Sequence, residues 1–214
     1  RELKTQAEAG AFGEQLDIGS LQTEIRCEDD SEWKDNWKAY FKPAKVSRSI
    51  VVKPTWESYE PKAGEKIIEI DPGMAFGTGT HETTSLCIRL MEDYLVPGEK
   101  VLDVGCGSGI LSIAGALLGA SEVLGVEIDP DAVAIAGENI ALNHVERIAS
   151  AQYGDLTKGI DFQADVIVAN LMADLVVTLS KDVARHLLPG GRYISSGILV
   201  EKMPEVVDAM RALG

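Results

Sequence analysis

Apolar and polar positions alternate in two regular ways from residue 100 to the end of the chain. Short apolar runs, typical of buried strands, are separated by longer stretches in which apolar residues recur every three or four positions, as in helices packed on a sheet. This alternation predicts an α/β fold with a doubly wound, mostly parallel sheet. We expect strands at 101–104, 123–126, 148–152, 166–169 and 193–195, and helices at 110–118, 131–142, 171–188 and 201–213. Ligands of such sheets bind beyond the carboxyl ends of the strands.

The first 70 residues have a different pattern, which predicts a small N-terminal α+β appendage. Residues 1–30 are weakly patterned, whereas residues 31–41 indicate a helix with Trp33 and Trp37 on one face. Short strands are expected at 48–52 and 66–70. We therefore divide the chain into residues 1–30, 31–70 and 71–214. Because the sequence begins with Arg1 and stops at Gly214 within a helical pattern, we expect truncation at both ends.

Composition narrows the classes of protein. The 214 residues carry 34 acids and 20 bases, for a net charge of −14, which disfavours direct nucleic-acid binding through phosphates. No apolar run approaches the roughly 18 residues that a membrane helix needs. Three cysteines, at Cys27, Cys87 and Cys106, are too few and too scattered for a disulfide framework or a zinc site. With no export signal visible, we expect a reducing, cytoplasmic location.

A glycine-rich loop follows the strand that ends at Val104. Gly105, Gly107 and Gly109 occupy alternate positions, which permits a tight turn with no side chain between the backbone and a ligand. Glu127 lies 22 residues after Gly105 at the end of the next expected strand, where a carboxylate can accept hydrogen bonds from ribose hydroxyls. The order predicts a site for an adenosine-type cofactor. The alternative is that the glycines only serve a tight strand-to-helix turn.

The spacing of the glycines indicates which of two cofactors, a dinucleotide or S-adenosylmethionine, the loop suits. A dinucleotide fingerprint needs a third glycine where this chain has Ile110, so a nicotinamide-dependent oxidoreductase is disfavoured. The pattern here, preceded by Asp103, is the form associated with S-adenosylmethionine. Cys106 is interpreted as a small residue of the loop rather than as a nucleophile.

Two further segments have side chains suited to the same site. The Gly- and Thr-rich segment 71–84 precedes the first strand and predicts a lid over the pocket, with Thr83 and Thr84 in the first turn of a helix. We interpret His81 as a surface or capping residue. Asn170 follows the strand 166–169, where its side-chain oxygen can accept a hydrogen bond from an amine. It can equally cap a helix that begins at Leu171, and the two roles are compatible.

Together these segments resemble the ribosomal protein L11 methyltransferase family. The most distinctive is 71–84, with the sequence DPGMAFGTGTHETT. It is followed, in the order of the family, by VLDVGCGSGIL at 101–111, GVEIDP at 125–130, ANL at 169–171 and SSGIL at 195–199. The tryptophan-containing segment WKDNWK at 33–38, with FKP at 41–43, also resembles the family's segment between its two domains. The resemblance covers residues 31–214.

The resemblance implies a class I, Rossmann-like methyltransferase fold and methylation of lysine and N-terminal amines of ribosomal protein L11. Residues 1–30 would be a remnant of the substrate-recognition region, 31–70 a linker, and 71–214 the S-adenosylmethionine-binding catalytic domain. No metal, membrane or nucleic-acid partner is implied. Asn170 would be the catalytic residue, and the cofactor-binding residues would be Phe76, Thr83, Thr84, Asp103, Gly105, Gly107, Gly109, Glu127 and Asn170.

Two departures and two rival functions accompany this resemblance. Glu127 stands where the family commonly has Asp, and the family's final strand pair is missing after Gly214, which would leave an exposed sheet edge. A methyltransferase for a different protein substrate is the main rival. A non-catalytic cofactor sensor is disfavoured because it would not need Asn170.

Overall fold

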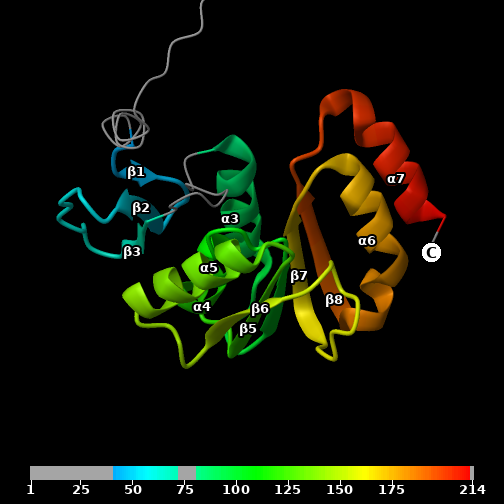
Figure 1. Ribbon diagram of the computed structural model, residues 1–214. Coiled ribbons are helices and arrows are strands. Elements are labelled where there is room, and N and C mark those ends of the chain that lie inside the picture. The colour runs from blue at the N-terminus through cyan, green and yellow to red at the C-terminus, as the bar shows by residue number, and fades with distance from the viewer. Residues whose placement is uncertain (1–40, 72–80, 213–214) are drawn as a thin grey trace, which may run out of the picture. The chain divides into compact units, whose positions relative to one another are not determined.

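The computed structural model describes residues 41–71 and 81–212 (Figure 1). Residues 41–214 form one compact unit, so the short strands before residue 71 belong to the same unit as the larger sheet. The helix expected at 31–41 lies outside the described residues except for Phe41, as do residues 1–30 and the segment 72–80.

A five-stranded parallel sheet forms the centre of this unit. Its order is β6-β5-β4-β7-β8, so the chain moves outward from β4 in one direction and then in the other. This reversal confirms the predicted doubly wound topology and places a crevice beyond the carboxyl ends of β4 and β7. The strands are β4 (Lys100–Val104), β5 (Glu122–Glu127), β6 (Ala149–Tyr153), β7 (Ala164–Asn170) and β8 (Leu187–Ser196).

Helices cover both faces of this sheet (Figure 1). On one face α3 packs against α4 and α4 against α5, whereas α6 and α7 pack together on the other. Asp129 is the N-cap of α5, because its side chain accepts a hydrogen bond from the Asp131 backbone N–H. Gly119 is the C-cap of α4 and has the left-handed conformation. The helices are α3 (Glu82–Tyr94), α4 (Ile110–Leu118), α5 (Pro130–Leu142), α6 (Ala173–His186) and α7 (Met203–Arg211), with a 3-10 turn η2 (Val200–Lys202).

The expected helix at 171–188 is too long at both ends. The backbone N–H of Leu171 donates to the carbonyl of Ser196, so α6 begins only at Ala173. At the other end β8 begins at Leu187, which pairs with Ala164 across a register shift in β7. Pairing with β7 therefore overrides the helical pattern of the sequence.

A second sheet of three strands precedes α3. β1 (Ala44–Lys45) pairs antiparallel with β2 (Ile50–Pro54), and β2 pairs in parallel with β3 (Lys66–Ile70). The strand at 66–70 is confirmed, whereas the strand expected at 48–52 begins and ends two residues later. β3 packs against α4 and α5, and the Asp71 N–H that follows it donates to Oδ1 of Asn139 in α5.

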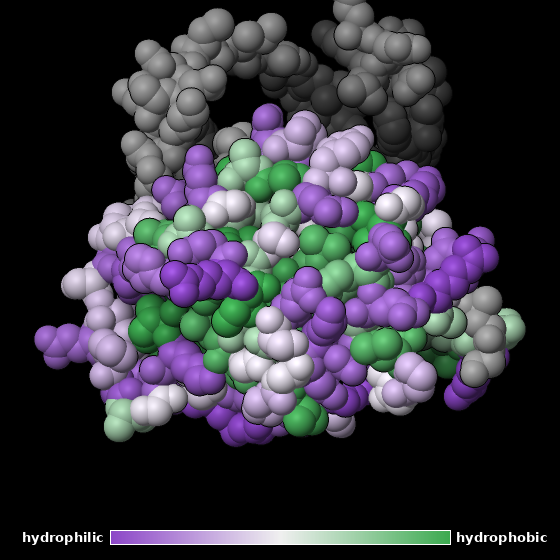
Figure 2. Space-filling view, turned by 90° about the horizontal axis from the view of Figure 1, so that it is seen from below, coloured by the Kyte–Doolittle hydropathy of each residue, from purple (hydrophilic) through white to green (hydrophobic). Residues whose placement is uncertain are grey.

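The hydrophobic core lies between the large sheet and its helices. Leu102, Ile167 and Leu179 are almost fully buried there. Hydrophobic side chains also reach the surface between hydrophilic ones across the middle of the face seen in Figure 2. Among the described helices, none is long and apolar enough to cross a membrane.

Candidate functional site

A cavity of about 300 Å³ lies at the carboxyl ends of β4, β5 and β7. Its walls are mainly apolar side chains and glycine backbone, with the polar side chains of Glu127, Asp155 and Asn170 among them. This composition is typical of a small-molecule site, in which a few polar groups fix the orientation of the ligand. The lining residues are Gly105, Gly107, Val126, Glu127, Ile128, Gly154, Asp155, Leu156, Asn170, Leu171 and Leu175.

The glycine loop from Gly105 to Gly109 forms the floor of the turn between β4 and α4. The backbone N–H groups of Gly105 and Cys106 both donate to the carbonyl of Val126, which fixes the loop to β5. Gly105 has a φ of +76°, and a Cβ there would lie 2.5 Å from Cδ2 of Leu171. Only glycine therefore permits this close approach of the loop to the start of the β7–α6 connection.

Glu127 connects the end of β5 to the same loop. Its Oε2 accepts a hydrogen bond from the Gly107 N–H at 2.9 Å, and its Oε1 accepts from the N–H groups of Ile128 and Asp129 at 2.8 and 3.1 Å. A carboxylate offers about four acceptor positions. The longer side chain of glutamate thus holds the loop in place and keeps an acceptor position for a ligand hydroxyl at the cavity wall.

Asn170 and Thr84 meet at the mouth of the crevice. Nδ2 of Asn170 donates to Oγ1 of Thr84 at 3.2 Å, which links the end of β7 to the first turn of α3. No donor to Asn170 Oδ1 is found among residues 41–71 and 81–212. The residue preceding α6 is Met172, and no side-chain hydrogen bond caps this helix. The capping role considered for Asn170 is therefore wrong, and its carbonyl oxygen remains available as an acceptor.

The remaining residues of the segment 71–84 have different positions. His81 accepts a hydrogen bond from the Thr83 N–H through Nδ1 at 3.3 Å, which confirms its interpretation as a capping residue. The Thr83 hydroxyl lies 2.8 Å from the same nitrogen, so Thr83 takes part in the helix cap and is not among the cavity-lining residues. Phe76 lies outside the described residues.

Asp103 lies inside the sheet and does not line the cavity, unlike the other acid expected at the site. It is fully buried, and its Oδ2 accepts a hydrogen bond from Ser112 Oγ at 2.7 Å, whereas its buried Oδ1 has no hydrogen-bond partner among the residues that the structure describes. Burial raises the pKa of Asp103 to about 7. Its position under the glycine loop makes it a support for the turn rather than a ligand contact.

The two described cysteines are free and buried. Burial raises the pKa of Cys87 to about 12 and raises the pKa of Cys106 further. Because the thiolate is the reactive form, neither is suited to nucleophilic catalysis. Within the described residues no three His, Cys, Asp or Glu side chains are grouped so that they can hold a metal ion.

Asn139 is a site residue that sequence reasoning missed. It is buried in α5, and its Nδ2 donates to the carbonyls of Ser108 at 2.9 Å and Asp71 at 3.1 Å. Its Oδ1 accepts from the Asp71 N–H at 3.0 Å. Asn139 thus joins the glycine loop to the residue where the segment 72–80 begins. A polar residue on the apolar side of an otherwise alanine-rich helix was the available signal.

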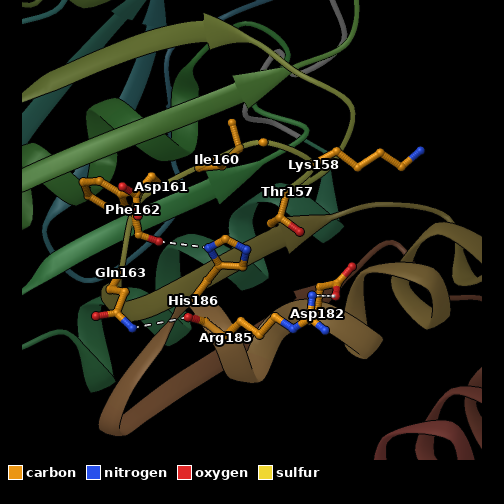
Figure 3. Close-up of a pocket in the computed structure, with 10 residues that line it drawn as sticks. Thr157, Lys158, Ile160, Asp161, Phe162, Gln163, Asp182, Arg185 and His186 are labelled. Carbon is orange, nitrogen blue, oxygen red and sulfur yellow. Dashed lines mark hydrogen bonds and ion pairs between the residues drawn. The ribbon is translucent and has the colours of Figure 1, made fainter.

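A larger cavity, of about 510 Å³, lies at the opposite edge of the sheet (Figure 3). Its polar side chains are largely engaged with one another: Nδ1 of His186 donates to the Phe162 carbonyl at 3.0 Å, and Arg185 pairs with Asp182 at 3.3 Å. None of the expected site residues lines it. The cavity at the carboxyl edge is therefore the better candidate, despite its smaller volume.

Comparisons with known proteins show which family the chain belongs to. The family model for ribosomal protein L11 methyltransferase (PrmA) matches residues 2–214. The chain is 50% identical over 201 residues to the ribosomal protein L11 methyltransferase of Caldanaerobacter subterraneus subsp. tengcongensis, covering 94% of this chain and 64% of that protein. It is 53% identical over 185 residues to that of Heliobacterium modesticaldum, covering 86% and 58%.

A solved structure of a member of this family has the same fold as this chain. The crystal structure of ribosomal protein L11 methylase from Lactobacillus delbrueckii subsp. bulgaricus superposes with a TM-score of 0.75 and 35% identity, covering 81% of this chain and 88% of that one. The present chain spans less than two thirds of the length of the two curated relatives. From the family match and the shared class I methyltransferase fold, we conclude that the chain belongs to the ribosomal protein L11 methyltransferase (PrmA) family.

Proposed function

We propose that this chain is an S-adenosylmethionine-dependent protein N-methyltransferase that modifies lysine and N-terminal amines of ribosomal protein L11. One observation carries the proposal: the glycine loop, Glu127 and Asn170 line a single cavity at the switch point of the sheet. The first two suit an adenosine group, and the third suits an amine. The choice of substrate is supported by the relatives described above, which are ribosomal protein L11 methyltransferases by name.

The residues of the cavity fit S-adenosylmethionine. Gly105 has no side chain, so its backbone lies close to Leu171 at the cavity wall. Glu127 keeps an acceptor position for a ribose hydroxyl. Val126, Ile128 and Leu156 offer apolar walls for a planar base. When bound, S-adenosylmethionine supplies an electrophilic methyl group whose leaving group is a neutral thioether.

Asn170 is the proposed orienting group for the acceptor amine. Its Nδ2 is held by Thr84, which directs the free Oδ1 toward donors such as an amine N–H. The amine attacks only when unprotonated, although a free lysine has a pKa of about 10.4. The apolar wall, with Leu171 and Leu175, disfavours the charged ammonium and lowers that pKa. Alignment of the two reactants can contribute on the order of 7–11 kcal/mol.

The partner we propose is basic. The chain carries a net charge of −14, which attracts a cationic protein and repels nucleic acid. We therefore propose that ribosomal protein L11 is recognised as a free protein rather than through RNA. The free thiols of Cys87 and Cys106 are consistent with a reducing compartment, and we place the activity in the cytoplasm.

The proposal is tested by incubating the chain with S-adenosylmethionine and unmodified ribosomal protein L11, then measuring the intact mass of L11. Methyl-sized increments are expected, and peptide mapping then names the modified amines. Asn170→Ala should abolish most of the turnover while cofactor affinity is retained. Gln163→Ala is the matched control, because it removes the same type of side chain at the opposite edge of the sheet. Equal turnover by Asn170→Ala and the parent would exclude the role of Asn170.

A methyltransferase for another protein is the second candidate. It is favoured if the chain binds S-adenosylmethionine tightly but leaves L11 unchanged. A nicotinamide-dependent reaction is disfavoured by Ile110, which is 2% exposed at the position of the third glycine of a dinucleotide fingerprint. Titration with both cofactors separates these possibilities before any substrate is added.

A further inference from the structure

Exposed apolar side chains gather where β7 and β8 end. We call them the apolar rim: Met172, Leu175, Leu199, Val200 and Met203, with exposed fractions of 72%, 39%, 70%, 76% and 55%. They come from the first turn of α6 and from the connection between β8 and α7. A group of large apolar side chains on the surface of a protein is typical of an interaction site.

The apolar rim is continuous with the cavity. Leu175 belongs to both. The connection after β8 lies directly against the end of β7, since the Leu171 N–H donates to the Ser196 carbonyl at 3.1 Å. A Cβ on Gly197 would lie 3.0 Å from Oδ1 of Asn170. A polypeptide that presents an amine to Asn170 can therefore contact this rim.

The charges at this edge of the sheet favour a partner of one charge sign. Helices of a parallel sheet begin at its carboxyl edge, and here the first turns of all described helices except α4 carry an acid: Glu82 in α3, Asp131 in α5, Asp174 in α6, Glu201 in η2 and Glu205 in α7. The basic residues Arg185 and Arg211 lie in the last turns of α6 and α7, at the opposite ends of these helices. Lys202, at the rim, is paired with Glu205 at 2.8 Å. This edge therefore attracts cationic groups.

We infer that the apolar rim docks the substrate segment that carries the acceptor amine, and that it selects a basic segment with an apolar side chain next to that amine. The inference rests on the proposed function. A second copy of this chain is a poorer occupant, because a two-fold contact would place the same five acids of each copy opposite one another. A cationic polypeptide satisfies both the acids and the apolar surface.

A pair of identical substitutions at opposite edges tests the inference. Val200→Ser removes an apolar contact from the rim, and Val96→Ser makes the same change at a residue that is 55% exposed before β4. The KM for L11 should rise about tenfold in Val200→Ser, since burial of a valine is worth about this much in affinity. Its kcat at saturating L11 and its affinity for S-adenosylhomocysteine should equal those of the parent. Val96→Ser should leave all three unchanged.

Substrate choice gives an independent readout. We would compare two lysine-containing basic peptides that differ only in whether leucine or serine is next to the lysine. The parent should prefer the leucine peptide about tenfold in kcat/KM, and the double variant Leu199→Ser/Val200→Ser should lose this preference. A preference that survives in the double variant would contradict the inference.

Binding without turnover separates this inference from the proposed function. The affinity of fluorescently labelled L11 would be measured by anisotropy with S-adenosylhomocysteine present. If the parent binds L11 but does not methylate it, the proposed function fails. The L11 affinities of the variants still show whether the apolar rim is the docking surface. Equal affinities for the parent and Val200→Ser overturn the inference. Absence of L11 binding by the parent, or an equal loss in Val96→Ser, also overturns it.

Discussion

Asn170 at the end of β7 donates from Nδ2 to Oγ1 of Thr84, a residue 86 positions earlier in the chain, over 3.2 Å. Thr84 is 1% exposed, so the acceptor of this hydrogen bond is buried, whereas Asn170 is half-buried at the cavity wall. The hydrogen bond fixes which end of the Asn170 amide faces the crevice. It also ties the first turn of α3 to the sheet, close to where the segment 72–80 joins this helix.

Thr84→Val should reduce turnover more than it reduces cofactor affinity. Valine keeps the shape of the side chain but removes the acceptor for Asn170 Nδ2. A buried donor left without a partner costs about 1–3 kcal/mol. The amide should then rotate or seek water, and kcat for L11 should fall about tenfold, which corresponds to about 1.4 kcal/mol. Steady-state kinetics and calorimetric titration with S-adenosylhomocysteine measure the two effects separately.

Thr84→Ser is the control for this variant. It retains the hydroxyl and loses one methyl group, which costs about 0.8 kcal/mol of stability. Its kcat should remain within about twofold of that of the parent, since Asn170 keeps its partner. Parent-like kcat in Thr84→Val would show that the hydrogen bond does not orient the amide for catalysis.

Glu127→Gln should weaken cofactor binding while leaving the chemical step nearly intact. The amide replaces an acceptor oxygen with an NH₂ group, which cannot accept from the N–H of Gly107 or of Ile128. The dissociation constant for S-adenosylhomocysteine should rise about 10- to 100-fold, a cost of about 1.4–2.8 kcal/mol. Turnover at saturating cofactor should change little.

Glu122→Gln is the matched control, at the other end of the same strand. Glu122 pairs with Lys100 at 2.7 Å in solvent, and such pairs contribute about 1 kcal/mol or less. Cofactor affinity should be unchanged there. An equal titration curve for Glu127→Gln and the parent would remove Glu127 from the cofactor site.

The sequence predicted those elements whose pattern is local. The helix at 110–118 and the strand at 66–70 have the expected bounds, because the apolar period, flanking glycines and polar ends agree. β8 is different: the sequence predicted a helix up to residue 188 and a strand only at 193–195, yet β8 begins at Leu187, which pairs with Ala164 ahead of a register shift. Such pairing depends on residues about 20 positions away and has no local signature.

In the candidate site, too, the sequence predicted the residues that a local motif positions and missed those positioned by contacts between distant elements. Gly105 and Glu127 are cavity-lining residues as expected, because a motif between a strand and a helix fixes where they lie. Asp103 belongs to the same motif, but it lies within β4, two residues before the loop, where it is fully buried and accepts a hydrogen bond from Ser112 of α4. The link from Asn139 to Asp71 joins two elements that the sequence did not place together.

Gly105→Ala should destabilise the fold through two separable effects. The φ of +76° costs a residue with a side chain about 1–2 kcal/mol, and the clash with Leu171 Cδ2 adds about 1–3 kcal/mol. Gly64→Ala isolates the first effect, because its φ is +82° and a Cβ there would meet nothing within 4 Å. Urea unfolding of both variants gives the two free energies.

A second-site change tests the contact itself. Leu171→Ala in the Gly105→Ala background removes the clashing side chain, so its cost should be smaller than that of Leu171→Ala in the parent. The coupling free energy between the two sites should be on the order of 1–2 kcal/mol. Additive effects would show that the loop does not need to approach Leu171.

Asp103 should make stability depend on pH in the direction opposite to that of most aspartates. Burial raises its pKa in the folded state from 3.8 to about 7, so between these values the folded chain retains a proton that the unfolded chain loses. The free energy of unfolding from this group is therefore highest below about pH 4. It falls by about 1.4 kcal/mol per pH unit up to about pH 7 and is then level.

Asp103→Asn tests this sign, because asparagine keeps the shape, accepts from Ser112 and does not titrate. Relative to the parent, its free energy of unfolding should rise by up to about 4 kcal/mol as the pH increases from about 4 to about 7. The other groups that act on Asp103 are Ser112, which stabilises the carboxylate, and Glu127, which opposes it by charge. Urea unfolding across this range measures the difference, with Asp161→Asn as a control at an exposed aspartate. A constant difference between Asp103→Asn and the parent across this range would show that the pKa of Asp103 is not raised in the folded state.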